Sequence, residues 1–201
     1  MRALLDHLGV ARAALAGNSF GGKVALDFAL AYPGRTAALI LVAPALTGWE
    51  GSAELEAFDE EEDALLEAGQ IDEAVELNVR TWLDGPERGP APVPPETRAR
   101  LTTMQREVFE TMLRALDASP PPGPVSWSDP PAATRLDEIA APTLVVACAH
   151  DLADFRAIAE VLAAGIPGAE HAVLDTAHLP GLEQPDELNR LLLDFLARHA
   201  S

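Results

Sequence analysis

The feature that most constrains this fold is a turn between a short apolar run and a helix near the beginning of the chain. Residues 13–24 read A-A-L-A-G-N-S-F-G-G-K-V. The apolar run stops at Gly17, and apolar residues return at helical spacing from Val24 onward. This pattern predicts a strand, a tight turn and a helix, with Ser19 at the apex of the turn. Glycines surround the serine because strand and helix can approach closely in a strained turn only where side chains are absent.

The turn matches G-x-S-x-G, a pattern in which the serine hydroxyl points outward from a strand-to-helix turn. We therefore expect Ser19 to act as a nucleophile; the alternative is an ordinary loop serine. The backbone N–H of Phe20 would then lie at a helix N-terminus, where it can stabilise a developing oxyanion.

A serine hydroxyl needs a base to remove its proton, and the base works best when a carboxylate fixes its tautomer. Sites in open α/β sheets collect at the carboxyl ends of strands, and His178 follows the last predicted strand. We predict that His178 is the base, rather than a structural loop histidine. The acid should follow the preceding strand, where Asp151 and Asp154 both qualify. We favour Asp151, which is nearer the strand, because Asp154 precedes a predicted helix and has an alternative role as its N-cap. The other histidines of the chain are His7, His150, His171 and His199.

Strand and helix patterns alternate on both sides of a long helical stretch. Continuous apolar runs predict buried parallel strands at 37–43 and 143–148, followed by a short strand at 172–174. Helices are expected to follow the two later strands, at 155–164 and 185–199. The middle of the chain contains two further predicted helices, 54–66 and 71–83, and a third with apolar residues at every third or fourth position, namely Leu101, Met104, Val108, Met112 and Leu116.

These patterns divide the chain into two parts. Residues 1–46 and 136–201 are expected to form an α/β core that is incomplete at its N-terminus. Residues 47–135 are expected to form an all-helical cap with a proline-rich linker at 119–131. The cap residues Trp49, Trp82, Met104 and Phe109 are interpreted as helix packing rather than as the lining of an acyl pocket.

The motifs together resemble the α/β-hydrolase superfamily, with Leu5–Pro44 and Ala141–Ala197 similar to its C-terminal part. G-N-S-F-G-G followed by A-x-x-Y-P resembles the nucleophile elbow of capped esterases and carbon–carbon bond hydrolases. H-L-P-G-L-E-Q-P resembles the histidine loop and the final helix. The resemblance implies a parallel sheet with a helical cap that shapes the substrate pocket. The order Ser19, Asp151, His178 is the one expected of such enzymes.

Two departures from the family pattern affect these expectations. Cys148 stands three residues before the predicted acid, where the family usually has glycine. The family also places several strands, a helix and the loop with the second oxyanion donor before the elbow, whereas this chain begins in the helix that precedes the elbow strand. One edge of the elbow strand is then left unpaired. Three expectations follow: the chain is inactive or weakly active because an oxyanion donor is missing, a second copy of the chain pairs with the open edge, or Met1 is not the true start of the protein. We favour the last of these, because everything from the elbow onward resembles an intact enzyme.

Composition excludes several other classes of function. Asp and Glu number 32 against 14 Lys and Arg, a formal net charge of −18, and such a surface repels nucleic acids and anionic membranes. The single cysteine, Cys148, lies in an apolar run and is expected to be a buried small side chain. The sequence has no zinc-type spacing, phosphate loop or cofactor fingerprint, so we expect no metal and no cofactor. The apolar run at residues 3–8 is too short and too polar for a signal peptide, and no apolar run is long enough to span a bilayer, so we expect a cytoplasmic protein.

We therefore expect a serine hydrolase that cleaves a carboxylic ester or a similar acyl substrate through an acyl-enzyme. Ser19 argues against haloalkane dehalogenases and epoxide hydrolases of this superfamily, which resemble the chain but carry aspartate at the elbow. Two alternatives remain: a hydrolase of carbon–carbon bonds in ring-fission products, and a non-catalytic binding or assembly protein with the hydrolase shape.

Overall fold

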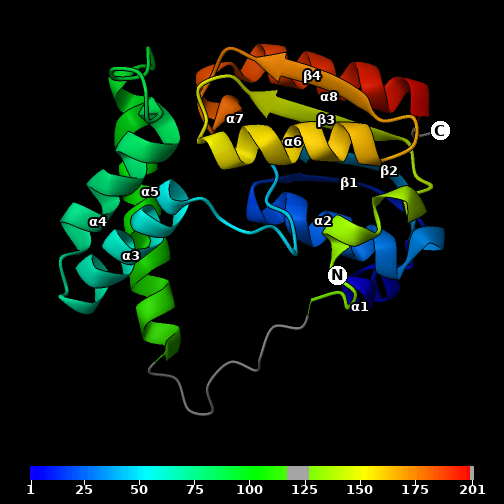
Figure 1. The fold of residues 1–201 in the computed structure, drawn as a ribbon, viewed down its shortest axis with the longest axis horizontal. Helices are drawn as coiled ribbons and strands as arrows, with labels where there is room; N and C mark the ends of the chain where they lie inside the picture. Colours follow the sequence, from blue (N-terminus) through cyan, green and yellow to red (C-terminus); the bar gives the residue numbers. More distant parts are fainter. Residues whose placement is uncertain (117–126, 200–201) are drawn as a thin grey trace. The chain divides into compact units, whose positions relative to one another are not determined.

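The computed structural model describes residues 1–116 and 127–199, so residues 119–126 of the predicted proline-rich linker lie outside the described part. The chain separates into two compact units, Met1–Glu50 with Trp127–Ser201, and Gly51–Ser126 (Figure 1). The first unit contains the sheet. Its elements are α1 (Arg2–His7), β1 (Ala13–Asn18), α2 (Phe20–Ala31), β2 (Thr36–Val42), β3 (Thr143–Cys148), α6 (Ala153–Gly165), β4 (Glu170–Leu174), α7 (Pro180–Glu183) and α8 (Pro185–His199), with short 3-10 turns at Pro33–Arg35, Ala132–Thr134 and Leu136–Glu138.

The four described strands form one parallel sheet in the order β1-β2-β3-β4. This confirms the predicted α/β architecture and its parallel sheet. All four strands run in the same direction, so their carboxyl ends lie along one edge. Among the described residues, β1 pairs only with β2 and is therefore an edge strand.

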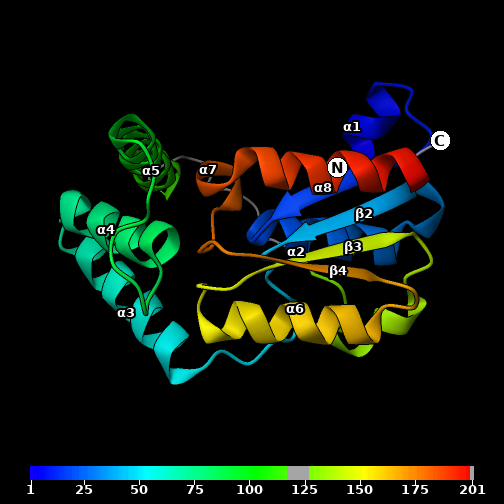
Figure 2. The same cartoon turned by 90° about the horizontal axis from the view of Figure 1, so that it is seen from above.

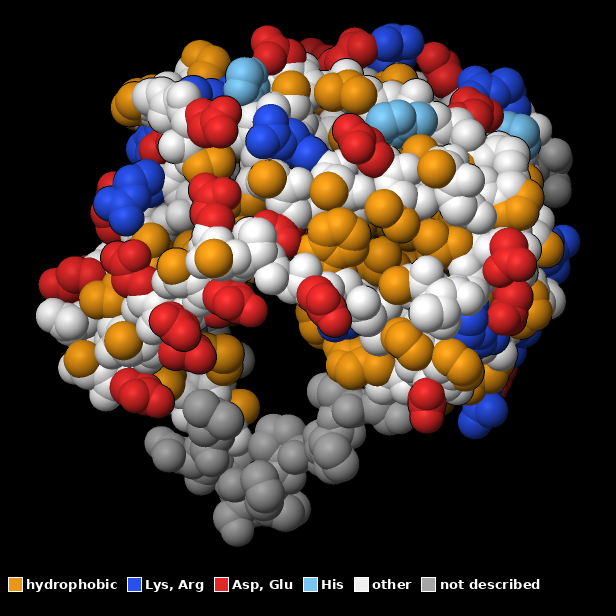
Figure 3. Space-filling view, in the orientation of Figure 1, with side chains coloured by type: hydrophobic (Ala, Val, Ile, Leu, Met, Phe, Trp, Pro, Cys, Tyr) orange, Lys and Arg blue, Asp and Glu red, His pale blue; other side chains and the backbone are white. Residues whose placement is uncertain are grey.

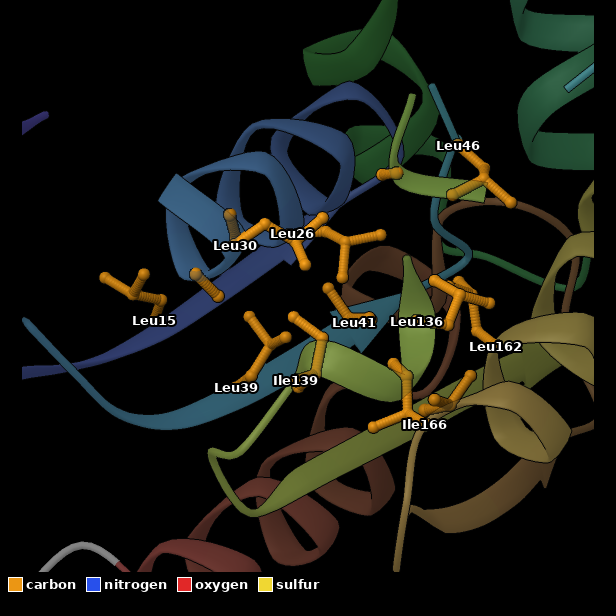
Figure 4. Close-up of a cluster of buried hydrophobic side chains, with 14 of the residues drawn as sticks. Leu15, Leu26, Leu30, Leu39, Leu41, Leu46, Leu136, Ile139, Leu162 and Ile166 are labelled. Carbon is orange, nitrogen blue, oxygen red and sulfur yellow. The ribbon is translucent and has the colours of Figure 1, made fainter. Parts of the chain in front are cut away.

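The central strands are apolar throughout because both faces of the sheet are covered (Figure 2). Leu39 and Leu41 of β2 belong to a cluster with side chains of α2 and α6, part of which is shown in Figure 4. Ile40, between them in the sequence, belongs to a second cluster with Phe195 of α8. Successive side chains of a strand point to opposite faces, so a strand between two helical layers needs apolar residues at every position.

The second unit is helical in its described part. Its elements are α3 (Ala53–Glu67), α4 (Ile71–Asn78), a π-helical turn (Val79–Asp84) and α5 (Pro95–Leu116). The stripe predicted for α5 is not its buried face, because Met104, Val108 and Met112 are 42–55% exposed while Phe109 is 3% exposed. Spacing identified a helix correctly, but it could not show which of two apolar faces meets the neighbouring helices.

Figure 3 shows acidic side chains spread over the visible surface with fewer basic ones between them, in keeping with the net charge of −18. None of the described helices combines the length and the apolar character that a bilayer span requires.

Candidate active site

Ser19 occupies a strained backbone conformation between β1 and α2. Its φ is 55° and its ψ is −121°, and apart from glycine only Ser19 and Ala43 have positive φ among the described residues. Such a conformation costs about 1–3 kcal/mol and persists only where surrounding contacts enforce it. Here the Ser19 N–H donates to the Val42 carbonyl (2.9 Å), and the Ser19 carbonyl accepts from the Ala45 N–H (3.1 Å). Ser19 precedes α2 as its N-cap, yet its hydroxyl makes no capping bond to the described first turn.

Two glycines make this turn possible. A Cβ at Gly17 would lie 2.2 Å from the Gly21 carbonyl carbon, and a Cβ at Gly22 would lie 2.9 Å from the Cβ of Pro44. Both distances are too short for any side chain, so the expected close approach of strand and helix is confirmed at these positions. Gly21 differs: a Cβ there would have nothing within 4 Å.

Phe20 is the first residue of α2, and its N–H is one of the four at a helix start that have no acceptor within the helix. Its side chain is 59% exposed and meets Trp127 edge to face, with ring centroids 5.5 Å apart. The Lys23 ammonium lies 4.2 Å from the centre of the same Trp127 ring.

Asp151 and His178 form a buried pair. His178 Nδ1 is 2.7 Å from Asp151 Oδ2, and the two residues are 4% and 2% exposed. The other carboxylate oxygen, Oδ1, accepts from the Leu152 N–H at 2.8 Å. Each oxygen of Asp151 therefore has an N–H partner, which fixes the carboxylate in one orientation. The aspartate in turn fixes the imidazole ring so that Nε2 is directed away from it.

Further contacts hold the loop of His178. The ring of Phe155 meets the imidazole edge to face, with centroids 4.4 Å apart. The Glu183 carboxylate accepts from the Ala177 N–H at 2.7 Å. The Asn18 amide donates to the carbonyls of Val42 (3.2 Å) and His178 (3.4 Å). Asn18 thereby links the residue before Ser19 to the loop that carries the histidine.

The structure brings Asp151 to His178 and ties the Ser19 turn to the His178 loop through Asn18. The described hydrogen bonds of Ser19 itself are made by its backbone. Sequence reasoning missed Asn18, Phe155 and Glu183. Asn18 had a signal, because it lies inside the elbow motif with a polar side chain at the end of a strand. Phe155 and Glu183 had none, since their roles depend on the packing of two loops.

The expectation that Asp154 serves as an N-cap is wrong. Helix α6 begins at Ala153 with Leu152 as its N-cap, and Asp154 lies in the first turn. Its carboxylate is 3% exposed and accepts from the Trp49 Nε1–H at 2.9 Å. Trp49 therefore belongs to the sheet unit, where it contacts a buried aspartate.

In the described part of the chain, no three His, Cys, Asp or Glu side chains lie close enough together to hold a metal ion. Cys148 is buried in β3 with 1% exposure. The groups that lie along the carboxyl edge of the sheet include a hydroxyl in a strained turn, a helix N-terminus and an imidazole oriented by a carboxylate. Such groups can carry nucleophilic catalysis at a carbonyl carbon.

Comparison with known proteins gives consistent matches over nearly the whole chain. Residues 1–191 match the family described as "Alpha/beta hydrolase family". A 2-hydroxy-6-oxononadienedioate/2-hydroxy-6-oxononatrienedioate hydrolase of Paraburkholderia phymatum is 31% identical over 98% of this chain and 67% of its own length.

Among solved structures, a hydrolase from Pseudomonas aeruginosa is 28% identical with a TM-score of 0.71, covering 97% of this chain and 68% of that one. An enol-lactonase from Burkholderia xenovorans shares the fold with a TM-score of 0.67 at 23% identity, covering 96% of this chain and 69% of that one. The chain thus spans about two thirds of the length of these relatives. The matched family and the relative above 30% identity agree with the parallel sheet and the serine turn: the chain belongs to the alpha/beta hydrolase family.

Proposed function

We propose that this chain carries the catalytic residues of a serine hydrolase that cleaves a carboxylic ester or a similar acyl substrate. The observation that carries the proposal is the buried Asp151–His178 bond at the same edge of the sheet as the strained Ser19. A structural histidine loop would not need a buried carboxylate with both oxygens engaged, because burying an ionisable pair costs free energy that apolar residues avoid.

In the proposed mechanism, the Ser19 hydroxyl attacks the substrate carbonyl while His178 Nε2 takes its proton. Asp151 holds the Nδ1–H and stabilises the imidazolium that forms. The Phe20 N–H donates to the oxyanion of the tetrahedral intermediate. The imidazolium then gives its proton to the leaving alcohol, and an acyl-enzyme remains on Ser19. A water molecule activated by His178 releases the acid and restores the serine.

The experiment that tests this proposal is intact mass measurement before and after treatment with a fluorophosphonate probe, with Ser19→Ala alongside. The probe reacts with serines that a base activates. We expect one adduct on the natural chain and none on the variant. A folded chain that gives no adduct would contradict the proposal and favour a non-catalytic binding or assembly role.

A second candidate is hydrolysis of a carbon–carbon bond. It is favoured by the elbow G-N-S-F-G-G, which resembles that of carbon–carbon bond hydrolases, and by the relative whose named substrate is a 2-hydroxy-6-oxo dicarboxylate. Turnover of simple aryl esters should be compared with turnover of a vinylogous diketone acid. Faster cleavage of the diketone acid would favour the second candidate, and faster cleavage of the esters the first.

We also propose that the second unit, Gly51–Ser126, serves as the cap that shapes the substrate pocket, as the resemblance to capped hydrolases implies. The other unit, Met1–Glu50 with Trp127–Ser201, contains the sheet. Exchange of this unit for that of a related esterase should change acyl-chain preference and leave probe labelling of Ser19 intact.

The open edge of β1 is the surface that we propose for a homodimer. Ala14 and Ala16 are exposed there, and an apolar edge strand with free N–H and C=O groups readily pairs with another strand. Sedimentation should show a dimer of the 21.3 kDa chain, which Ala16→Lys should convert to a monomer. A monomeric natural chain would contradict this proposal.

A further inference from the structure

A second histidine–aspartate pair lies in the two loops that hold Asp151 and His178. His150 Nε2 is 2.7 Å from Asp175 Oδ1, and the side chains are 37% and 84% exposed. His150 follows β3, next to Asp151, while Asp175 follows β4, three residues before His178. Each loop therefore contributes one histidine and one aspartate, and both pairs cross from one loop to the other.

Backbone hydrogen bonds continue the pairing of β3 and β4 beyond the ends of the strands. The Ala149 N–H donates to the Leu174 carbonyl and the His150 N–H to the Thr176 carbonyl, both at 2.9 Å. On the other side, the Gln184 amide donates to the Asp175 carbonyl at 3.1 Å. The side-chain pair thus closes a short backbone ladder that leads directly to the buried Asp151–His178 bond.

We propose that His150 and Asp175 are a positioning pair that holds the loop of His178 against the loop of Asp151. Neither residue is assigned a contact with substrate. The pair acts through the Asp151–His178 geometry, since a shift of residues 175–178 relative to residues 149–151 changes the 2.7 Å bond between the two buried groups. The consequence for catalysis rests on the proposed serine hydrolase function, whereas the effect on the Asp151–His178 bond does not.

Two further contacts hold the same loops. The Arg156 guanidinium of α6 donates to the Ala149 carbonyl at 3.4 Å, and Glu183 of α7 accepts from the Ala177 N–H at 2.7 Å. The side-chain bond between His150 and Asp175 is the contact among these that joins one loop directly to the other.

The test combines two measurements on the whole chain. The first is the rate constant of fluorophosphonate labelling at Ser19, measured by intact mass. The second is the proton NMR signal of the His178 Nδ1–H, which reports the Asp151–His178 bond without any catalysis. The variants are His150→Ala, Asp175→Ala, the double variant and Asp175→Asn, which keeps a neutral acceptor for His150. His171→Ala is the matched control, because His171 is an exposed histidine of β4 outside both loops.

We expect each alanine variant to lower the labelling rate about two- to fivefold, as for a partly exposed ion pair. The double variant should be no slower than the slower single one, because the two side chains act as a unit. Asp175→Asn, which keeps a neutral acceptor for His150, should lose less rate than Asp175→Ala. The Nδ1–H signal should broaden in the alanine variants, and His171→Ala should match the natural chain in both measurements.

The proposal is overturned if the alanine variants stay within about 1.5-fold of the natural rate with an unchanged Nδ1–H signal, or if the two single effects multiply in the double variant. If the natural chain is not labelled at all, the proposed function fails and the NMR signal alone decides. Broadening would then support the positioning pair, and an unchanged signal would contradict it.

Discussion

Replacing Asp151 with asparagine is the most direct way to test the proposed acid. The two carboxylate oxygens of Asp151 accept from two N–H groups, those of Leu152 and the His178 ring. Asparagine has one oxygen and one NH₂ group, so it can satisfy only one of these donors. If its oxygen keeps the Leu152 bond, its NH₂ faces His178 Nδ1. The imidazole then carries its proton on Nε2, the nitrogen that must act as the base.

The catalytic tautomer requires the opposite arrangement, in which the asparagine oxygen faces Nδ1–H and the NH₂ group faces the Leu152 N–H. Two buried donors then oppose each other without an acceptor. Each unsatisfied donor costs about 1–3 kcal/mol, so the productive state lies about 2–6 kcal/mol higher. At about 1.4 kcal/mol per factor of ten, we expect labelling and ester hydrolysis to fall by about 30-fold to about 10⁴-fold.

Asp154→Asn is the matched control, because Asp154 is equally buried, lies three residues away and accepts from Trp49 instead of a histidine. We expect it to label within a few-fold of the natural chain, and circular dichroism should show that both variants are folded. If Asp151→Asn keeps its rate while Asp154→Asn loses it, Asp154 is the acid and our assignment is wrong. If both keep their rates, no carboxylate of this segment orients the base.

Three further predictions concern stability. Gly17→Ala should lower the free energy of unfolding, measured by urea denaturation, by about 3 kcal/mol or more, since its Cβ would lie 2.2 Å from the Gly21 carbonyl carbon. Gly21→Ala, whose Cβ would lie in open space, should leave the free energy of unfolding unchanged or slightly higher. Equal effects of the two substitutions would contradict the steric argument. Burial raises the pKa of Asp84, but hydrogen bonds from Arg98 and the Ala91 N–H outweigh it and hold that pKa below its ordinary value of 3.8. Asp84 therefore stabilises the fold above about pH 4, and this stabilisation is lost as pH falls through its lowered pKa. The difference in melting temperature between the natural chain and Asp84→Asn should shrink on acidification. A difference that stays constant with pH would refute the stabilising role of the ionised carboxylate. Thr176→Val should raise the free energy of unfolding by about 1 kcal/mol, because the buried Thr176 hydroxyl has no hydrogen-bond partner among the described residues. If urea denaturation gives a lower free energy of unfolding instead, the hydroxyl is hydrogen-bonded in the folded protein.

Local patterns were sufficient to predict the elements of the sheet unit. The strand–turn–helix at Ser19 and the strand Thr143–Cys148 appear where the sequence places them, and the parallel α/β fold is confirmed. Such elements depend on residues close together in the chain, so a short window contains the relevant information. The buried face of α5 could not be predicted from the spacing of its apolar residues, because burial depends on neighbouring helices that no window contains.

The candidate site divides in the same way. Ser19 and the glycine at position 17 belong to one continuous motif, and the steric reason for that glycine was predictable. The contacts of Asn18 and Phe155 with the His178 loop join segments that are distant in the sequence, whereas Glu183 lies close to that loop in the sequence. To predict these contacts, one must know how far each loop extends past the carboxyl edge of the sheet. Composition and spacing do not give this information.

How far the two loops extend past the sheet edge follows from the register of β3 and β4. Cys148 is paired with Leu174, so Asp151 stands three residues past the paired position and His178 four residues past it. Because these two segments are of nearly equal length, the side chains of Asp151 and His178 can meet. Asp154, in contrast, stands six residues past Cys148 and is already inside α6. The choice of Asp151 over Asp154 would follow from this register alone. The sequence could not reveal it, because β3 is buried on both faces and lacks the alternation of polar and apolar residues that fixes register in a half-exposed strand.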